Sequence, residues 1–191
     1  MLRRGFADPV HEAQAAFRAL LEATAQPGTL VRLPEPETPP PLAPAAAAIA
    51  LALCDAETPL WLSAALATEP VRTWLRFHVG SSLVADPQAA AFAFAAGDEA
   101  PFERLAIGTD EAPERSSTLV LTVSAFGEGT ALRLAGPGVE TETVVAVAGV
   151  GTSFVAWRAR NHALYPRGVD VLLVAGDRAM ALPRTTLIRE V

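Results

Sequence analysis

The sequence predicts an α/β fold in which a mixed β-sheet is flanked by helices. Short β-branched apolar runs bounded by turn residues, such as residues 169–175, are typical of strands buried on both faces. Longer segments with apolar residues at helical spacing, such as residues 9–26, are typical of helices. The helices and strands do not alternate regularly, which indicates a mixed sheet. At 191 residues the chain fits a single domain spanning residues 1–191.

The first quarter of the chain predicts a helix, a strand and a second helix. The first helix begins at Asp8 or Pro9, with an acid in its first turn, and Pro27-Gly28 ends it. The side chains of residues 29–33 alternate in polarity, as in a strand that has one face exposed to solvent. After a stiff proline-rich connector, residues 42–53 are apolar on most sides, which predicts a helix that is buried or lies at an interface.

The middle of the chain predicts short strands and one helix whose start is clearly marked in the sequence. Strands are expected at residues 59–62 and 91–95, with a candidate strand at 82–84. The hydroxyl of Thr68 is expected to cap a helix that continues to about residues 76–78. Residues 97–115 are rich in acids and prolines and should form a loop, with a short helix over 102–107.

The last third predicts two hairpins and one helix. Residues 117–123 form a strand that a glycine turn at 127–129 returns into a second strand at 130–134. Residues 143–150 suit either a strand or the approach to a helix, and residues 153–164 suit a helix. The final hairpin joins residues 169–175 to 179–182 at the centre of the sheet. Pro183 should end it, because proline has no N–H for a strand ladder.

Arginine supplies all of the positive charge, which limits the possible chemistry. The chain has 15 basic residues and no lysine among them. A Schiff base with pyridoxal phosphate needs a lysine amine, and so does a Walker phosphate-binding loop, so both are excluded. The formal net charge of -6 argues against nucleic-acid binding. A single cysteine, Cys54, excludes an intrachain disulfide.

The chain carries no sequence sign of a membrane or of export. Its first eight residues are charged and are not followed by an apolar segment, so no signal peptide is expected. The longest apolar run, residues 42–53, is too short to cross a bilayer. We therefore expect a cytoplasmic protein that does not contact a membrane.

The chemically active residue types form no recognisable catalytic or metal-binding pattern. The three histidines, His11, His78 and His162, are far apart in sequence and lack zinc-ligand spacing. Cys54 could be a nucleophile, but a lone thiol at a helix end is more often a packing residue. Ser116 and Ser117 lack the glycines of a hydrolase elbow. We therefore predict no catalytic residue, no metal and no cofactor.

Three arginines are the candidate anion-binding residues. Arg76, Arg167 and Arg184 lie at the ends of predicted elements, where their side chains could converge on a phosphate or carboxylate. Surface charge or an ion pair between subunits is the alternative role for each. The glycine-rich segments 136–138 and 149–152 could also present N–H groups to a phosphate, although a structural turn is the more common role of such segments.

An ordered set of short segments resembles one known family. The segments, in order along the chain, are residues 13–18 with 27–28, 53–62, 75–78, 132–138, 165–170 and 183–186. Together they resemble the PhnH family of the bacterial carbon–phosphorus lyase system. The resemblance covers nearly the whole chain, and it depends on the order of the segments because no single one is diagnostic.

This resemblance implies a role in phosphonate catabolism. The family is similar in fold to the pyridoxal-phosphate transferases but lacks the cofactor, and the absence of lysine agrees with this independently. The resemblance implies a homodimer that joins subunits G, I and J in a core complex. That complex couples an alkylphosphonate to ATP and forms α-D-ribose 1-phosphonate 5-triphosphate. No catalytic residue carries over, so the chain is either an assembly subunit or a subunit that binds ATP or phosphonate through its arginines.

Overall fold

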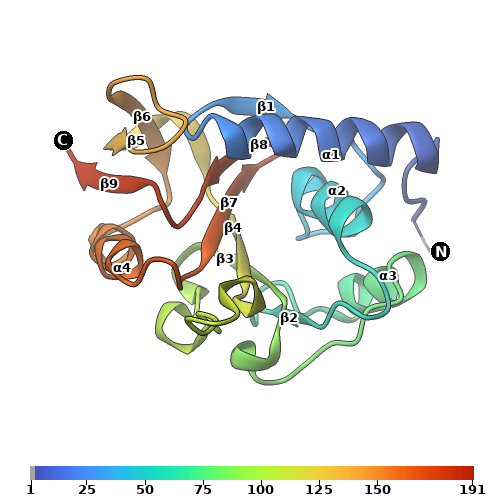
Figure 1. Ribbon diagram of the computed structural model, residues 1–191. Helices are drawn as coiled ribbons and strands as arrows, with labels where there is room; N and C mark the ends of the chain where they lie inside the picture. The colour runs from blue at the N-terminus through green and yellow to red at the C-terminus, as the bar shows by residue number, and fades with distance from the viewer. Residues whose placement is uncertain (1–2) are drawn as a thin grey trace.

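The computed structural model describes residues 3–191 and has three layers (Figure 1). The middle layer is a six-stranded sheet in the order β1-β8-β7-β4-β3-β2. Its strands are β1 (Leu30–Arg32), β2 (Leu60–Leu62), β3 (Phe92–Ala96), β4 (Thr118–Thr122), β7 (Asp170–Ala175) and β8 (Arg178–Leu182). The neighbours from β2 to β7 are parallel, whereas β8 is antiparallel to both β7 and β1. The predicted α/β class with a mixed sheet is confirmed.

The outer layers differ from each other in composition. Three helices cover one face of the central sheet: α1 (Pro9–Ala25), α2 (Pro44–Leu53) and α3 (Glu69–His78). The other face carries α4 (Thr152–Ala163) and a small sheet of β5 (Ala125–Ala135), β6 (Thr143–Ala148) and β9 (Leu187–Glu190). Short 3₁₀ turns lie in the connections, at Pro87–Ala89, Gly97–Glu99, Phe102–Arg104 and Pro113–Arg115.

A hydrophobic core lies on each face of the central sheet, and alternate residues of the central strands point into one core or the other. Val120 of β4 packs with the helices α1 to α3, while its neighbours Leu119 and Leu121 pack with α4 and the small sheet. A strand buried on both faces needs no polar side chains, which is why these segments appear in the sequence as continuous apolar runs.

Alanine allows α1 and α2 to lie close to each other and to the sheet. Six consecutive residues of α2, from Ala45 to Ala50, are fully buried, and five of them are alanine. From α1, Ala16 and Ala23 are also fully buried in this layer. The side chain of Asp8 caps α1 by accepting a hydrogen bond from the backbone N–H of His11 at 3.1 Å. The predicted first helix and the buried helix over residues 42–53 are both confirmed.

Several local predictions need correction. Thr68 is the N-cap residue of α3, but its hydroxyl makes no capping hydrogen bond, so the predicted hydroxyl cap is wrong. The helix expected over 102–107 is only a 3₁₀ turn, and Ile107 instead forms an isolated bridge with Ser116. The candidate strand at 82–84 is limited to one bridge between Leu83 and Leu60.

The predicted hairpin between residues 117–123 and 130–134 is wrong. The first of these strands, β4, lies between β3 and β7 in the central sheet, whereas β5 begins at Ala125 and belongs to the small sheet. The glycines do not form a turn, because β5 continues through them with a register shift between Phe126 and Thr130. A Cβ on Gly129 would lie 2.5 Å from the Cα of Ala148, so only glycine fits at this bulge.

Residues 143–150, for which strand and helix approach were both open, form the strand β6. Among the described residues no helix is long and apolar enough to cross a membrane.

The close α1–α2 contact makes adjacent alanines of α1 respond differently to the same change. We expect Ala16→Leu to lower the free energy of unfolding by about 1–3 kcal/mol, because the buried site has no room for the larger side chain. Ala15→Leu should change it by less than about 0.5 kcal/mol, because Ala15 is exposed. Urea titration followed by circular dichroism would measure both, and equal losses would contradict the packing described.

Candidate functional site

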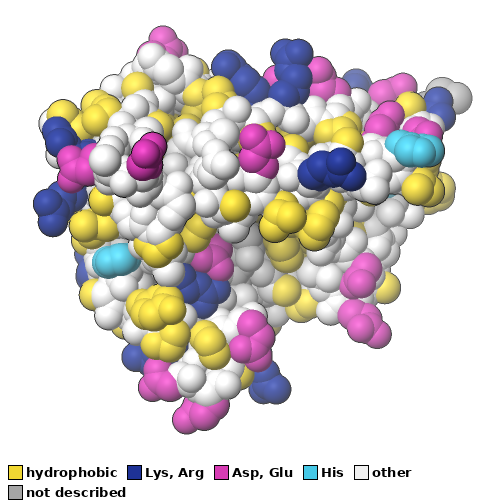
Figure 2. Space-filling model, turned by 45° about the horizontal axis from the view of Figure 1, so that its top comes forward, with side chains coloured by type: hydrophobic (Ala, Val, Ile, Leu, Met, Phe, Trp, Pro, Cys, Tyr) yellow, Lys and Arg dark blue, Asp and Glu magenta, His cyan; other side chains and the backbone are white. Residues whose placement is uncertain are grey.

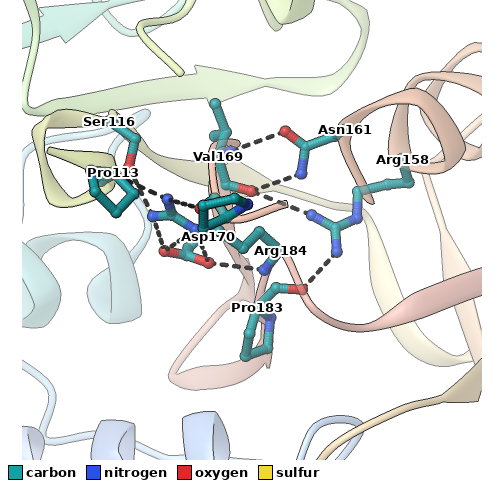
Figure 3. A network of polar contacts seen from close by, with 9 residues as sticks. Pro113, Ser116, Arg158, Asn161, Val169, Asp170, Pro183 and Arg184 are labelled. Atoms are coloured by element: carbon teal, nitrogen blue, oxygen red, sulfur yellow. Dashed lines mark hydrogen bonds and ion pairs between the residues drawn. The ribbon is translucent and has the colours of Figure 1, made fainter. Parts of the chain in front are cut away.

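The most extensive polar cluster joins the start of β7 to the segment after β8 (Figure 3). Asp170, the first residue of β7, accepts from the Arg184 side chain at 2.6 Å (Nη2) and 3.2 Å (Nε). The backbone N–H of Arg184 also donates to Asp170 Oδ1 at 2.7 Å. These contacts form because β7 and β8 are antiparallel neighbours, so the end of one lies beside the start of the other.

The remaining donors of Arg184 are also occupied. Nη1 donates to the carbonyl oxygen of Pro113 at 2.9 Å and to that of Pro166 at 3.3 Å. Nη2 donates to Ser116 Oγ at 2.6 Å. The Arg184 side chain is only 14% exposed. An anion could bind Arg184 only by displacing some of these contacts.

A second arginine of the cluster, Arg158 of α4, is fully buried and binds backbone carbonyl groups. Nη1 donates to Val169 O at 3.2 Å, and Nη2 donates to Pro183 O at 2.7 Å and Thr186 O at 3.2 Å. Burial lowers the pKa of Arg158 to about 10, and the charge of Asp170 acts in the opposite direction. The positive charge is therefore held mainly by backbone dipoles.

Asn161 completes the attachment of α4 to β7. Its side-chain amide accepts from the backbone N–H of Val169 at 2.8 Å and donates to the carbonyl of the same residue at 3.0 Å. Arg158 and Asn161 thus both bind Val169, immediately before β7 begins (Figure 3). The cluster can fix the start of β7, and most of its donors and acceptors are bound within the chain, although Arg158 Nε has no partner among the described residues. It contains no pair of groups arranged as a nucleophile and a base.

The structure brings two of the three predicted arginines near each other. Arg184 contacts the carbonyl of Pro166, the residue before Arg167, and Arg167 forms an ion pair with Asp110 at 3.1 Å. Arg76 is exposed on α3, on the opposite side of the central sheet from α4 (Figure 1). Anion binding by these residues stays a prediction.

The other candidates show the geometry of packing and turn residues. Burial raises the pKa of the Cys54 thiol to about 12, with a smaller contribution from Asp55, so the thiolate is disfavoured. A Cβ on Gly138 would lie 2.1 Å from the carbonyl oxygen of Ala25, and one on Gly149 would lie 2.8 Å from Ser124 Oγ. These glycines permit close contact between segments. The described residues contain no group of three or more potential metal ligands.

Sequence reasoning missed Arg158 and Asn161, although a signal was present. Both lie at helical spacing from Phe154 and Trp157, which are the buried apolar residues of α4. A polar residue on the apolar face of a helix is expected to have a buried partner.

The burial of Arg158 predicts a large loss of stability when it is removed. We expect Arg158→Met to lower the free energy of unfolding by at least about 3 kcal/mol, because three buried hydrogen bonds from a charged donor to carbonyl groups are lost. The matched control is Arg160→Met on the same helix, where an exposed ion pair with Glu103 is worth less than about 1 kcal/mol. Comparable losses in urea titrations of the two variants would show that Arg158 has no special role.

The raised pKa of Cys54 predicts slow alkylation of the folded protein. At pH 8 we expect iodoacetamide to label native Cys54 about a thousandfold more slowly than the unfolded chain, because the thiolate is rarer by that factor. Mass spectrometry at timed intervals would measure both rates. Rapid labelling of the native protein would restore Cys54 as a candidate nucleophile.

Comparison with known proteins identifies the family. The family model of the bacterial phosphonate metabolism protein PhnH matches residues 4–189. A Rhizobium meliloti (strain 1021) protein named alpha-D-ribose 1-methylphosphonate 5-triphosphate synthase subunit PhnH is 43% identical over 184 residues, covering 95% of this chain and 92% of the relative. A Stutzerimonas stutzeri protein named putative C-P lyase subunit protein HtxG is 37% identical over 183 residues, covering 92% and 85%. The chain therefore belongs to the PhnH family of bacterial phosphonate metabolism proteins.

Proposed function

We propose that this protein is a non-catalytic assembly subunit of the carbon–phosphorus lyase core complex. In this role it is needed for forming α-D-ribose 1-phosphonate 5-triphosphate from ATP and an alkylphosphonate. The observation that carries the proposal is 43% identity, over nearly the full length of both chains, to a named subunit of that synthase. The polar cluster around Arg158 and Arg184 supports it, because most of its groups are bound within the chain.

An exposed apolar stripe on α1 supports an assembly role. Val10, Phe17 and Leu21 are 75%, 53% and 58% exposed, and their spacing places them along one side of the helix. Hydrophobic side chains lie among charged ones over α1 in Figure 2. Large apolar groups in a row on an otherwise polar helix face are typical of a surface that another protein covers. We propose that another carbon–phosphorus lyase subunit, one of G, I and J, covers this stripe.

The remaining parts of the proposal concern self-association, fold relationship and location. We propose a cytoplasmic protein that forms a homodimer in addition to its contacts with other subunits. Its layered fold is proposed to be that of pyridoxal-phosphate transferases without the cofactor. The absence of lysine supports the lack of the cofactor, because no side chain could form a Schiff base with the aldehyde of pyridoxal phosphate.

The alternative function is binding of ATP or a phosphonate by Arg76, Arg167 and Arg184. Arg76 favours it, because it is exposed and has no ion pair with any described residue. The internal contacts of Arg184 and the position of Arg76 on another layer favour the assembly role instead.

The α1 stripe generates a direct test of the assembly role. We expect the double variant Phe17→Ser, Leu21→Ser to lose co-purification with subunits G, I and J while its thermal unfolding stays close to that of the wild type. Phe77→Ser on α3 is the matched control, because Phe77 is 69% exposed and lies outside the stripe. A complex of unchanged mass with the double variant would remove α1 from the interface. Failure of the wild-type chain to co-purify would contradict the assembly role itself.

The alternative makes a separate prediction. If arginines bind the substrates, then Arg76→Ala and Arg167→Ala should weaken ATP or phosphonate binding to the assembled complex, measured by calorimetry, and leave its composition intact. The assembly role predicts unchanged affinity in both variants. Arg184 is unsuitable for this test, because its removal would also unbind Asp170 and Ser116.

A further inference from the structure

The strand β6 is an open edge of the small sheet. The sheet has the order β6-β5-β9, so β6 pairs with β5 on one side and with no strand on the other in the described chain. Its six residues read Thr-Val-Val-Ala-Val-Ala. In an antiparallel pair, alternate residues direct their N–H and C=O groups away from the partner strand. About half of the polar backbone groups of β6 are therefore available to another strand.

The other sheet edges are protected in ways that β6 is not. At the opposite edge of the small sheet, β9 has four residues and includes the charged Arg189 and Glu190. In the central sheet the edge strands β1 and β2 have only three residues each. Leu60 of β2 also exchanges backbone hydrogen bonds with the segment 82–84, at 2.8 and 2.9 Å. Short length, charge and cover are the usual means by which proteins prevent edge-to-edge pairing.

By contrast, β6 has the composition of a strand in the interior of a sheet. It is the longest of the four edge strands and contains no charged residue and no proline. Four of its residues are β-branched, and Val144 is 55% exposed. An edge of this kind is expected to be covered in the assembled protein.

We propose that β6 pairs antiparallel with β6 of a second copy, so that the two small sheets join into one six-stranded sheet across a two-fold axis. This inference rests on the homodimer proposed above and assigns its surface. It leaves the α1 stripe free for a different subunit.

The homodimer proposed above favours a second copy as the occupant, and the distribution of charge around β6 permits one. Val145 and Val147 face the core and Val144 faces out, so a continuous sheet must place residues of like orientation opposite each other. Centring the pair on Val145 meets this condition and sets Val144 opposite Ala146 of the second copy. Glu142 and Glu140, which precede β6, then lie opposite Ala148 and Val150, so like charges do not meet across the two-fold axis.

The first test places charged residues at the proposed interface between the two β6 strands. We expect the wild-type chain to elute with twice its mass of 20.0 kDa and the double variant Val144→Lys, Ala146→Lys to elute as a monomer, measured by light scattering. Glu190→Lys on β9 is the control and should remain dimeric. Circular dichroism and thermal unfolding report whether each variant is folded.

The second test does not depend on destabilising anything. In a Cys54→Ala background, single cysteines at positions 144, 145 and 146 test the three nearest registers. Opposed residues in an antiparallel pair lie within the span of a disulfide. We expect one of the three to form an intermolecular disulfide under mild oxidation, and Arg189→Cys on β9 to form none.

Three results would overturn the inference. These are a monomeric wild type, a folded lysine variant that remains dimeric, and cross-linking at position 189 but at none of the three β6 positions. None of them bears on the assembly role, which co-purification with subunits G, I and J tests separately. Loss of co-purification by the lysine variant, with a dimer still present, would instead assign β6 to a different subunit.

Discussion

The buried guanidinium of Arg158 connects α4 to the segments before and after the β7–β8 hairpin. Pro183 follows β8 of the central sheet and Thr186 precedes β9 of the small sheet, and Arg158 binds the carbonyls of both. Its third acceptor, Val169, precedes β7. A side chain of α4 thus fixes the entry to the central hairpin and the crossing between the two sheets. Because breaking the hydrogen bonds of a buried charge is costly, these segments cannot easily separate from one another.

The neighbouring pair of Arg184 and Asp170 extends this constraint to the loop before β4. Arg184 reaches Pro113 and Ser116, so the long connection after β3 is held to the same point. The two arginines therefore act mainly on the architecture. The surfaces proposed to contact other proteins lie elsewhere, on α1 and on the edge of the small sheet. This division suits a subunit whose contribution to chemistry is made through its partners.

The sequence predicted the fold class because the strongest local signals agreed with the tertiary structure. Residues 169–175 and 117–123 are apolar enough to identify as buried strands, and Asp8 and Pro9 mark a helix start. The hairpin error has a clear cause: glycines permit both a turn and a bulge, and only the pairing of β5 with β6 decides between them. For the candidate site, sequence reasoning named Arg184 but gave no indication that Asp170 and Ser116 occupy its donors. Such contacts join residues far apart in the chain and leave no local pattern.

The order of strands in the central sheet also governs when the protein can fold during its synthesis. The first strand, β1, pairs only with β8. The backbone of Leu30 therefore cannot form its hydrogen bonds within the sheet until Met180 has been synthesised. Likewise, β4 acquires its neighbour β7 about fifty residues after it has been made. Until nearly the whole chain has left the ribosome, the alanine-rich layer of α1 and α2 has no complete sheet to cover. A nascent chain of this protein therefore carries its helical apolar surfaces exposed for most of translation, and it is most prone to aggregate during that time.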